Sequence, residues 1–407
     1  MTTLANEKQR TTVSKKVLYQ SKKEKTQLII QHWIRILNIK LGWIHDFDKL
    51  VANYIATVFI LDTFISSSKL IKTFCGHIDN VWSIDYSTFD CNHLLCSGSS
   101  DATIRVWDID ANKQIQLLNN ENSSSVYCVK FSSYHYHNYH RNIICFCSYD
   151  NTIRFWDIKD NQQLQIFNEH TRWVGGIEFS SFNGGRYLCS GSADTTMRLW
   201  DVETSKSLHV FDGHTSAVRC VDFSPLQNSN NDNKNNNIGV IGGNGYTICS
   251  GSWEAIINIW DIETTKQLNT FEGHKRGVNS VKYGSNELIN TILSGSEEGS
   301  VRLWDIRSGK QIQVFYGHTD WVNTVEYSPF IVNNIEVDFN SNVICSGSSD
   351  NTIRFWDVRS NKKELYVING DKEIICFKFL QIKKNKNNCY DINLCYGSRN
   401  GLIHIWG

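Results

Sequence analysis

A Trp-Asp dipeptide recurs along most of this 407-residue chain and constrains how it can fold. Neighbouring tryptophans of the series stand 44 to 60 residues apart, and the last one is followed by Gly instead of Asp. The series is Trp107, Trp156, Trp200, Trp260, Trp304, Trp356 and Trp406. Self-similarity at this period indicates one supersecondary unit that is repeated with loops of variable length. The sequence therefore predicts seven consecutive units.

Each unit has the pattern of short β-strands. The residues before the tryptophan alternate between apolar and polar, as in Thr-Ile-Arg-Val-Trp at 103–107 and Thr-Ile-Arg-Phe-Trp at 352–356. A Ser-Gly-Ser turn entry precedes this stretch in most units, and another alternating run lies further upstream, as at 322–327. A period of two between clusters of Gly, Ser, Asn and Asp is typical of strands. The pattern indicates an all-β repeat protein.

A second dipeptide marks the start of most units. Gly-His occurs at Gly76-His77, Gly213-His214, Gly273-His274 and Gly317-His318, with Glu169-His170 as a variant. With the Trp-Asp pairs, these units resemble WD40 repeats over roughly residues 69–407. The resemblance implies a seven-bladed β-propeller over 67–407, in which Leu70-Ile-Lys-Thr-Phe74 closes the ring by pairing with the last blade.

The resemblance also implies a hydrogen-bonded chain in which Trp bonds to Ser, Ser to His and His to Asp within one blade. The expected sets are His77, Ser97, Asp101 and Trp107; His170, Ser190, Asp194 and Trp200; and His318, Ser346, Asp350 and Trp356. Glu254 and Glu298 replace Asp in the fourth and fifth blades, whereas Phe146 and Tyr396 replace Ser in the second and seventh. A catalytic site would not be written several times, so we expect these residues to be structural and the protein not to be an enzyme.

Long insertions at 133–141, 226–245, 330–341 and 382–391 occupy the same place in their units, so one face of the ring stays compact. By the resemblance, partners dock on this compact face. The residues expected there are Trp82, Tyr127, Tyr149, Trp173, Arg219, Trp253, Trp321 and Arg399. Trp, Tyr and Arg dominate binding hot spots. The alternative is that several of these rings only pack against neighbouring blades.

Other candidate sites are weaker. His135, His137 and His140 lie close together in an insertion, but histidines in a loop need a fourth ligand and rigidity to hold zinc. We expect no metal and no cofactor. Many of the 13 cysteines return at one place in the repeat, which indicates buried, reduced thiols rather than disulfides.

The N-terminal part does not match the repeat. Residues 1–25 carry seven Lys or Arg against two Glu and are expected to be a basic disordered tail. Residues 26–66 have apolar residues at helical spacing, including Ile30, Trp33, Leu37 and Leu50, and are expected to form a helical extension. Packing on the propeller, dimerisation and partner docking all remain open for this extension.

The function expected from these observations is a non-catalytic scaffold that binds protein or peptide partners on the compact face. An alternative is a substrate receptor of a cullin-type ubiquitin ligase, because Trp304-Asp-Ile-Arg307 and Trp356-Asp-Val-Arg359 match the WD-x-R signature of such receptors. The zero formal net charge argues against a nucleic-acid partner, and no segment has the pattern of a membrane span. We expect a cytoplasmic protein, with the nucleus as the alternative compartment; the oligomeric state stays open.

Overall fold

The computed structural model describes residues 59–87, 93–120, 122–225, 246–284, 288, 290–331, 343–359, 364–384 and 389–407. The expected basic tail, residues 1–25, lies outside the described residues, as does the expected helical extension up to residue 58. The compact unit that contains all described residues begins at Phe59, earlier than the boundary expected at residue 67.

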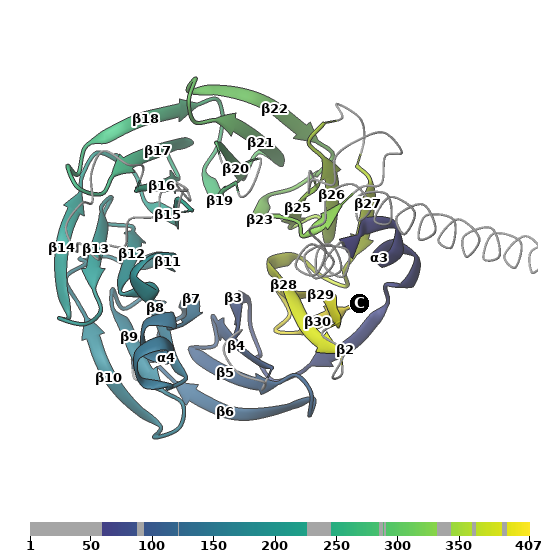
Figure 1. Ribbon diagram of the computed structural model, residues 1–407, viewed down its shortest axis with the longest axis horizontal. Helices are drawn as coiled ribbons and strands as arrows, with labels where there is room; N and C mark the ends of the chain where they lie inside the picture. Colours follow the sequence, from purple (N-terminus) through teal and green to yellow (C-terminus); the bar gives the residue numbers. More distant parts are fainter. Residues whose placement is uncertain are drawn as a thin grey trace, which may run out of the picture. The chain divides into compact units, whose positions relative to one another are not determined.

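Seven four-stranded antiparallel sheets follow one another around a ring, which confirms the seven-bladed propeller (Figure 1). The innermost strands are β3 (Val81–Tyr86), β7 (Val126–Phe131), β11 (Val174–Phe179), β15 (Val218–Phe223), β19 (Val278–Tyr283), β23 (Val322–Tyr327) and β28 (Ile374–Lys384). The second strands are β4 (Leu94–Ser99), β8 (Ile143–Ser148), β12 (Tyr187–Ser192), β16 (Thr247–Ser252), β20 (Thr291–Ser296), β25 (Val343–Ser348) and β29 (Cys389–Ser398).

The third strands carry the blade tryptophans. They are β5 (Thr103–Asp108), β9 (Ile153–Asp157), β13 (Met197–Asp201), β17 (Ile256–Asp261), β21 (Ser300–Asp305), β26 (Thr352–Asp357) and β30 (Ile403–Trp406). The outer strands are β6 (Lys113–Asn119), β10 (Gln162–Phe167), β14 (Lys206–Phe211), β18 (Gln267–Glu272), β22 (Lys310–Tyr316), β27 (Tyr366–Asn369) and β2 (Leu70–Phe74).

Burial follows the position of a strand in its blade. The second strand of blade three, Tyr187–Ser192, is buried along its whole length, because neighbouring strands cover both its edges and adjacent blades cover both its faces. The outer strand Lys206–Phe211 alternates between exposed and half-buried residues and ends on the buried Phe211, because one face meets water. The core therefore consists of apolar layers between successive blades.

The ring is closed by strands from the two ends of the propeller. Strand β2 pairs antiparallel with β30, with Leu70 opposite Trp406 and Phe74 opposite Ile403. The Thr73 hydroxyl also lies 3.1 Å from Nδ1 of His404. This pairing covers an edge of β30 that would otherwise be open to another strand.

Two of the insertions are folded, although both were expected to be loops. Residues Ser133–Tyr139 form helix α4, with Tyr134 and His135 buried, and Asn183–Gly185 form the short 3-10 helix η1 next to it. In the insertion at 382–391, the described residues 382–384 and 389–391 extend β28 and β29, with Lys384 opposite Cys389. Burial of aromatic rings and continued strand pairing stabilise these segments beyond what their polar composition indicates.

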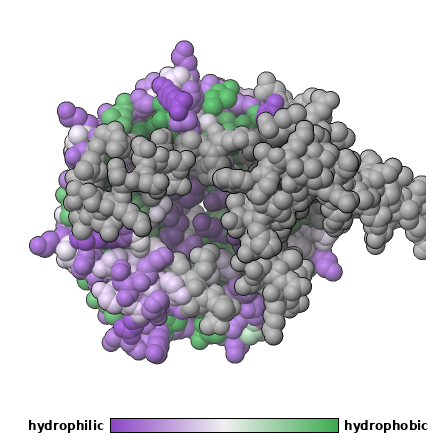
Figure 2. Space-filling model, in the orientation of Figure 1, coloured by the Kyte–Doolittle hydropathy of each residue, from purple (hydrophilic) through white to green (hydrophobic). Residues whose placement is uncertain are grey.

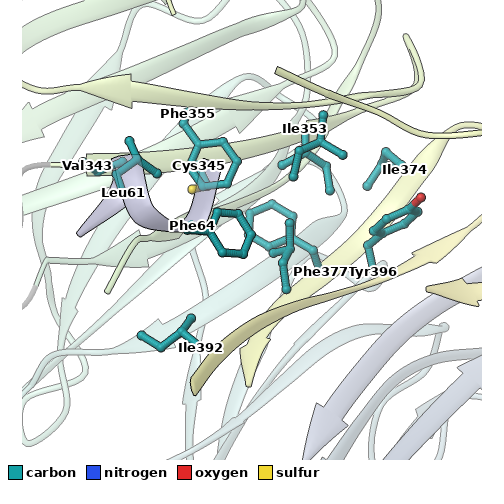
Figure 3. Close-up of a cluster of buried hydrophobic side chains, with 12 residues drawn as sticks. Leu61, Phe64, Val343, Cys345, Ile353, Phe355, Ile374, Phe377, Ile392 and Tyr396 are labelled. Atoms are coloured by element: carbon teal, nitrogen blue, oxygen red, sulfur yellow. The ribbon is translucent and has the colours of Figure 1, made fainter. Parts of the chain in front are cut away.

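The segment before β2 is attached to blades six and seven. Strand β1 (Phe59–Ile60) pairs parallel with β24 (Phe330–Ile331), whereas a helix was expected at residues 59–60. Helix α3 (Leu61–Ser67) follows this strand. Leu61 and Phe64 of α3 are buried among side chains of β25, β26, β28 and β29 (Figure 3). Their spacing of three residues places both side chains on one face of the helix.

Every helix in the described part of the chain is too short or too polar to cross a membrane.

Candidate functional site

A β-bulge follows the first residue of all seven innermost strands. In β3, for example, Val81 pairs with Ser99 and Ser83 with Gly98, which leaves Trp82 as the extra residue. The extra residues of the seven strands are Trp82, Tyr127, Gly175, Arg219, Asn279, Asn323 and Ile375. A bulge bends its strand and re-aims a side chain. The repeat thus presents one residue from each blade at the centre of the ring.

These residues surround a cavity of about 600 Å³. All eight residues predicted for the compact face contribute to its wall: Trp82, Tyr127, Tyr149, Trp173, Arg219, Trp253, Trp321 and Arg399. A cavity of this size, with aromatic walls and a few polar groups, is typical of binding sites.

Five of the aromatic residues form a continuous arc from blade one to blade four. Ring centroids lie 5.7 Å apart for Trp82 and Tyr127, 5.4 Å for Tyr127 and Trp173, and 5.4 Å for Trp173 and Trp253. Tyr149 contacts Tyr127 edge-on at 6.4 Å. Tyr149 and Trp253 are 58% and 48% exposed, so the arc remains open to a ligand. These rings therefore pack against neighbouring blades and also offer exposed surface to a partner.

Arg219 lies within this arc. Its guanidinium carbon is 4.8 Å from the ring centroid of Trp82, 5.2 Å from that of Tyr127 and 5.9 Å from that of Trp173, all within cation–π range. Burial lowers the pKa of Arg219, and the neighbouring Tyr127 and cysteine side chains only partly oppose this effect. The guanidinium is held by three aromatic rings, and within the described part of the chain it forms no ion pair.

The other two predicted residues lie apart from the arc. Trp321 is 45% exposed and makes no ring contact in the described part of the chain. Arg399 is paired with Glu373 at 2.5 Å. Glu297 also lines the cavity, and burial raises its pKa, an effect that Arg276 and Arg219 partly oppose. The cavity thus has an aromatic side with a cation and a more polar side.

Hydrogen bonds fix several of the bulge residues. Trp82 Nε1 donates to the Ser100 hydroxyl at 2.6 Å. The Asn323 side-chain amide donates to the Ser349 hydroxyl at 2.9 Å and to the Ile374 carbonyl at 2.8 Å. Held side chains lose little conformational entropy when a ligand binds. The wall of the cavity is therefore preorganised.

A ring of charged residues around the central channel was not predicted, although its signal is in the sequence; five of its seven members line the cavity. The fifth residue of every innermost strand is charged: Asp85, Lys130, Glu178, Asp222, Lys282, Glu326 and Lys378. Figure 2 shows hydrophilic residues at the centre of the ring. Inward-facing residues at one register position of seven strands must meet at one level of the channel.

The best-defined part of this charged ring spans blades two to five. Lys130 Nζ lies 2.6 Å from Glu178, and Lys282 Nζ lies 3.3 Å from Glu178 and 3.1 Å from Asp222. Burial raises the pKa of Asp222. Burial would also raise the pKa of Glu178, but the two lysines outweigh it and hold that pKa below its usual range. These ion pairs form a polar floor beneath the aromatic arc.

The Trp-Ser-His-Asp sets are connected within their blades. In blade one, Trp107 Nε1 donates to Ser97 at 2.9 Å, and the His77 ring nitrogens lie 2.8 Å from the Ser97 hydroxyl and 2.9 Å from Asp101. The corresponding distances are all 2.8 Å for Trp200, Ser190, His170 and Asp194. For Trp356, Ser346, His318 and Asp350 they are 2.8, 2.7 and 2.8 Å.

Blades four and five use a glutamate in the same chain. His274 lies 2.8 Å from Ser294 and 2.7 Å from Glu298, and His214 contacts Ser250 and Glu254. Burial lowers the pKa of His274, and the hydrogen bond with Glu298 only partly opposes it. The serine hydroxyls of these chains are fully buried and accept a hydrogen bond from tryptophan, so each chain links residues of one blade.

Blades two and seven lack this chain and are held differently. Phe146 is buried in the apolar layer between blades one and two. Tyr396 lies 4.9 Å from the ring of His404 and is buried with Phe377 and Ile374. Aromatic side chains thus take the place of the serine in both blades, and in blade two Asp150 is paired with Arg154 at 3.2 Å.

The three histidines of the blade-two insertion do not gather into a metal site. His135 is buried in α4, its Nδ1 lies 2.8 Å from the Ser132 hydroxyl, and burial lowers its pKa to about 4. His137 bonds instead to the Ser133 carbonyl. Among the residues that the structure describes, no three His, Cys, Asp or Glu side chains are grouped as metal ligands would be.

Arg307 and Arg359 are exposed and lie in the turns that follow β21 and β26. Ile306 N–H donates to the Asn290 carbonyl, which places the first of these turns beside the connection between β19 and β20. Arg307 and Arg359 each donate a backbone N–H to the aspartate of their Trp-Asp pair, at 3.2 and 3.0 Å. Their side chains are thus on the insertion side of the ring and not at the cavity.

Comparison with known proteins agrees with this architecture. The model for WD40, the WD domain or G-beta repeat, matches residues 68–108, 112–157, 161–201, 205–261, 265–305 and 309–357. The matched segments end before blade seven, whose Tyr396 and Asn400 depart from the repeat pattern.

Two curated proteins of Arabidopsis thaliana are similar to short parts of the chain. Protein SPA1-RELATED 3 is 35% identical over 82 residues, which cover 20% of this chain and 9% of that protein. Protein SPA1-RELATED 4 is 33% identical over 69 residues, covering 17% and 8%. The chain thus spans less than a tenth of the length of these relatives. The six matched repeats cover more than half of the chain and, with the seven-bladed ring, show that it belongs to the WD40-repeat family.

Proposed function

We propose that this propeller is a non-catalytic scaffold that binds a peptide segment of a partner protein in the cavity of its compact face. The observation that carries the proposal is Arg219, a cation held by three aromatic rings at the wall of an open cavity. Propellers of the WD40 family are typically used as interaction scaffolds. The cavity supplies the specific site that such a role needs.

The chemistry of the wall indicates the kind of peptide. Arg presents a planar fork that binds a carboxylate through two parallel hydrogen bonds, and this bond is stronger where water is excluded. Trp253 and Tyr149 offer exposed aromatic surface on either side of the Arg219 cage. We therefore propose a segment with an Asp or Glu side chain between apolar residues.

The test is a selection of displayed disordered peptides on the full-length protein, followed by affinity measurements on synthetic peptides. We expect enrichment of acidic residues flanked by apolar ones, and loss of binding in Arg219→Gln. Arg307→Gln is the matched control, because Arg307 is exposed and lies away from the cavity. Enriched peptides without an acidic residue, or equal affinity for the wild type and Arg219→Gln, would refute the proposal.

The two Trp-Asp-x-Arg turns support a second candidate, a substrate receptor of a cullin-type ubiquitin ligase. Arg307 and Arg359 are exposed in adjacent blades and lie away from the cavity, so an adaptor and a substrate would bind without overlap. Affinity capture with the wild type should recover a ligase adaptor, and Arg307→Ala combined with Arg359→Ala should lose it. An unchanged set of captured proteins would rule this candidate out.

A further inference from the structure

Blade two contains two cysteines that face each other across neighbouring strands. Cys128 of β7 is directly opposite Cys147 of β8 in the antiparallel register. Opposite residues project from the same face of a sheet, and their Cα atoms are about 4.5 to 5.5 Å apart, within the span that a disulfide needs. Both cysteines are present as thiols.

The rest of the propeller shows that this pair is specific to blade two. The position of Cys147 is glycine in the other six blades, namely Gly98, Gly191, Gly251, Gly295, Gly347 and Gly397. Cys220 and Cys376 stand at the position of Cys128 in blades four and seven, but each is opposite a glycine. The chain therefore contains two single cysteines that serve as internal references for the pair.

The surroundings of Cys128 make it the reactive member. Cys128 is half-buried and lines the cavity, whereas Cys147 is fully buried, with its sulfur 3.2 Å from the Val174 carbonyl. The hydrogen bond with Cys147, assisted by the charge of Lys130, lowers the pKa of Cys128 to about 6 despite its burial. Burial raises the pKa of Cys220 instead, to about 12. A thiolate is the nucleophilic form of cysteine.

We propose that Cys128 and Cys147 form a peroxide-responsive dithiol, in which Cys128 is oxidised first and Cys147 resolves it to a disulfide within blade two. Two structural observations carry this proposal: the two cysteines face each other across neighbouring strands, and Cys128 opens to the cavity. The oxidant is a hydroperoxide, of which hydrogen peroxide is the smallest.

The reaction balances in two steps. The Cys128 thiolate attacks one oxygen of hydrogen peroxide, the O–O bond breaks, and the departing hydroxide takes up a proton as water, which leaves a sulfenic acid. The Cys147 thiol then loses its proton, and its sulfur attacks the Cys128 sulfur. The S–O bond breaks, and the second hydroxide leaves as water with that proton. Two thiols and one peroxide give one disulfide and two waters.

The disulfide would lie next to the proposed binding site. Cys128 adjoins Tyr127 in sequence, and Tyr127 contacts both Trp82 and Trp173. A bond from β7 to β8 beneath the bulge would fix the position of this ring. The proposal does not depend on the identity of the peptide, because its test reads the cysteines directly.

The test treats the full-length protein with hydrogen peroxide, blocks the remaining thiols and maps peptides without reduction. We expect a cross-linked peptide pair containing Cys128 and Cys147, lost on treatment with dithiothreitol. Because the thiolate fraction sets the rate, Cys128 should react at least about tenfold faster than Cys220 or Cys376. Cys220→Ser is the matched control and should leave the cross-link unchanged.

A variant then separates the two steps. Cys147→Gly restores the residue of the other blades and should stop the reaction at a sulfenic acid on Cys128, which dimedone traps; Cys147→Ser serves if the glycine variant does not fold. Absence of the Cys128–Cys147 cross-link in the wild type, a bond from Cys128 to Cys145 instead, or reaction of Cys128 no faster than Cys220 would overturn the proposal.

Discussion

The guanidinium of Arg219 lies 4.8 Å from the ring of Trp82, although the two residues belong to blades four and one. The contact crosses the centre of the ring and joins blades that share no strand pairing. It exists because a β-bulge at the same place in each innermost strand turns one side chain toward the cavity. A repeated backbone irregularity thus gathers residues that are far apart in sequence.

Arg219→Lys should weaken the binding of acidic peptides while keeping the positive charge. Lysine lacks the planar fork and stacks less well on aromatic rings, so we expect a loss of roughly tenfold, which corresponds to about 1.4 kcal/mol. Titration of a labelled peptide with the wild type and the variant measures this loss of affinity. Equal affinities would show that positive charge alone is enough for peptide binding.

The buried serine of a Trp-Ser-His-Asp chain should matter for stability. In Ser190→Ala, Trp200 and His170 both lose a buried hydrogen-bond partner, and we expect a loss of about 1–3 kcal/mol in the free energy of unfolding. Ser216→Ala is the control, because its hydroxyl makes no hydrogen bond within the described part of the chain. Urea denaturation compares the variants, and a loss of the same size in both would contradict the structural role.

Blade closure through β2 gives a further prediction. Phe74 is buried and its ring lies 5.1 Å from that of Trp107, so Phe74→Ala should cost about 3–5 kcal/mol. Ile71, in the same strand, is exposed, and Ile71→Ala should change the melting temperature little. A single unfolding transition at lower temperature is expected for Phe74→Ala. An unchanged melting temperature would mean that β2 does not hold the ring closed.

Acid should destabilise the propeller in two stages. Burial lowers the pKa of His135, His214 and His274, so these groups stay neutral in the fold while the unfolded chain binds protons below about pH 6.5. Their contribution to the free energy of unfolding is complete above that pH and is lost as the pH falls. Below about pH 4, Asp101 and Asp194 add a steeper loss, because hydrogen bonds from His77 and His170 outweigh burial and hold their pKa values below the usual range.

Melting temperatures measured from pH 8 to pH 3 check this profile. His135→Gln should make the decline between pH 6.5 and pH 4 shallower, since that variant loses one buried neutral histidine. A propeller that becomes more stable on acidification from pH 7 to pH 5 would contradict the argument.

The repeat period, the blades and the wall residues of the cavity could be predicted because each occurs at the same position in several repeat units of the sequence. The arrangement within the cavity could not. Periodicity does not show that Arg219 stacks against Trp82 while Trp321 stays apart, because these relations depend on how seven bulged strands converge. The burial of Phe64 of α3 between blades six and seven was also missed, since a seven-residue helix carries little periodic signal.

The most direct test of the central claim places a photo-crosslinking amino acid at Tyr149, on the rim of the cavity, and in a second protein at Tyr316, which is 73% exposed on the outer strand of blade five. The account predicts that a partner protein is captured in cells from position 149, that Arg219→Gln abolishes this capture, and that position 316 does not capture the same protein. Capture of the same partner from position 316, or capture from position 149 that persists in Arg219→Gln, would contradict it.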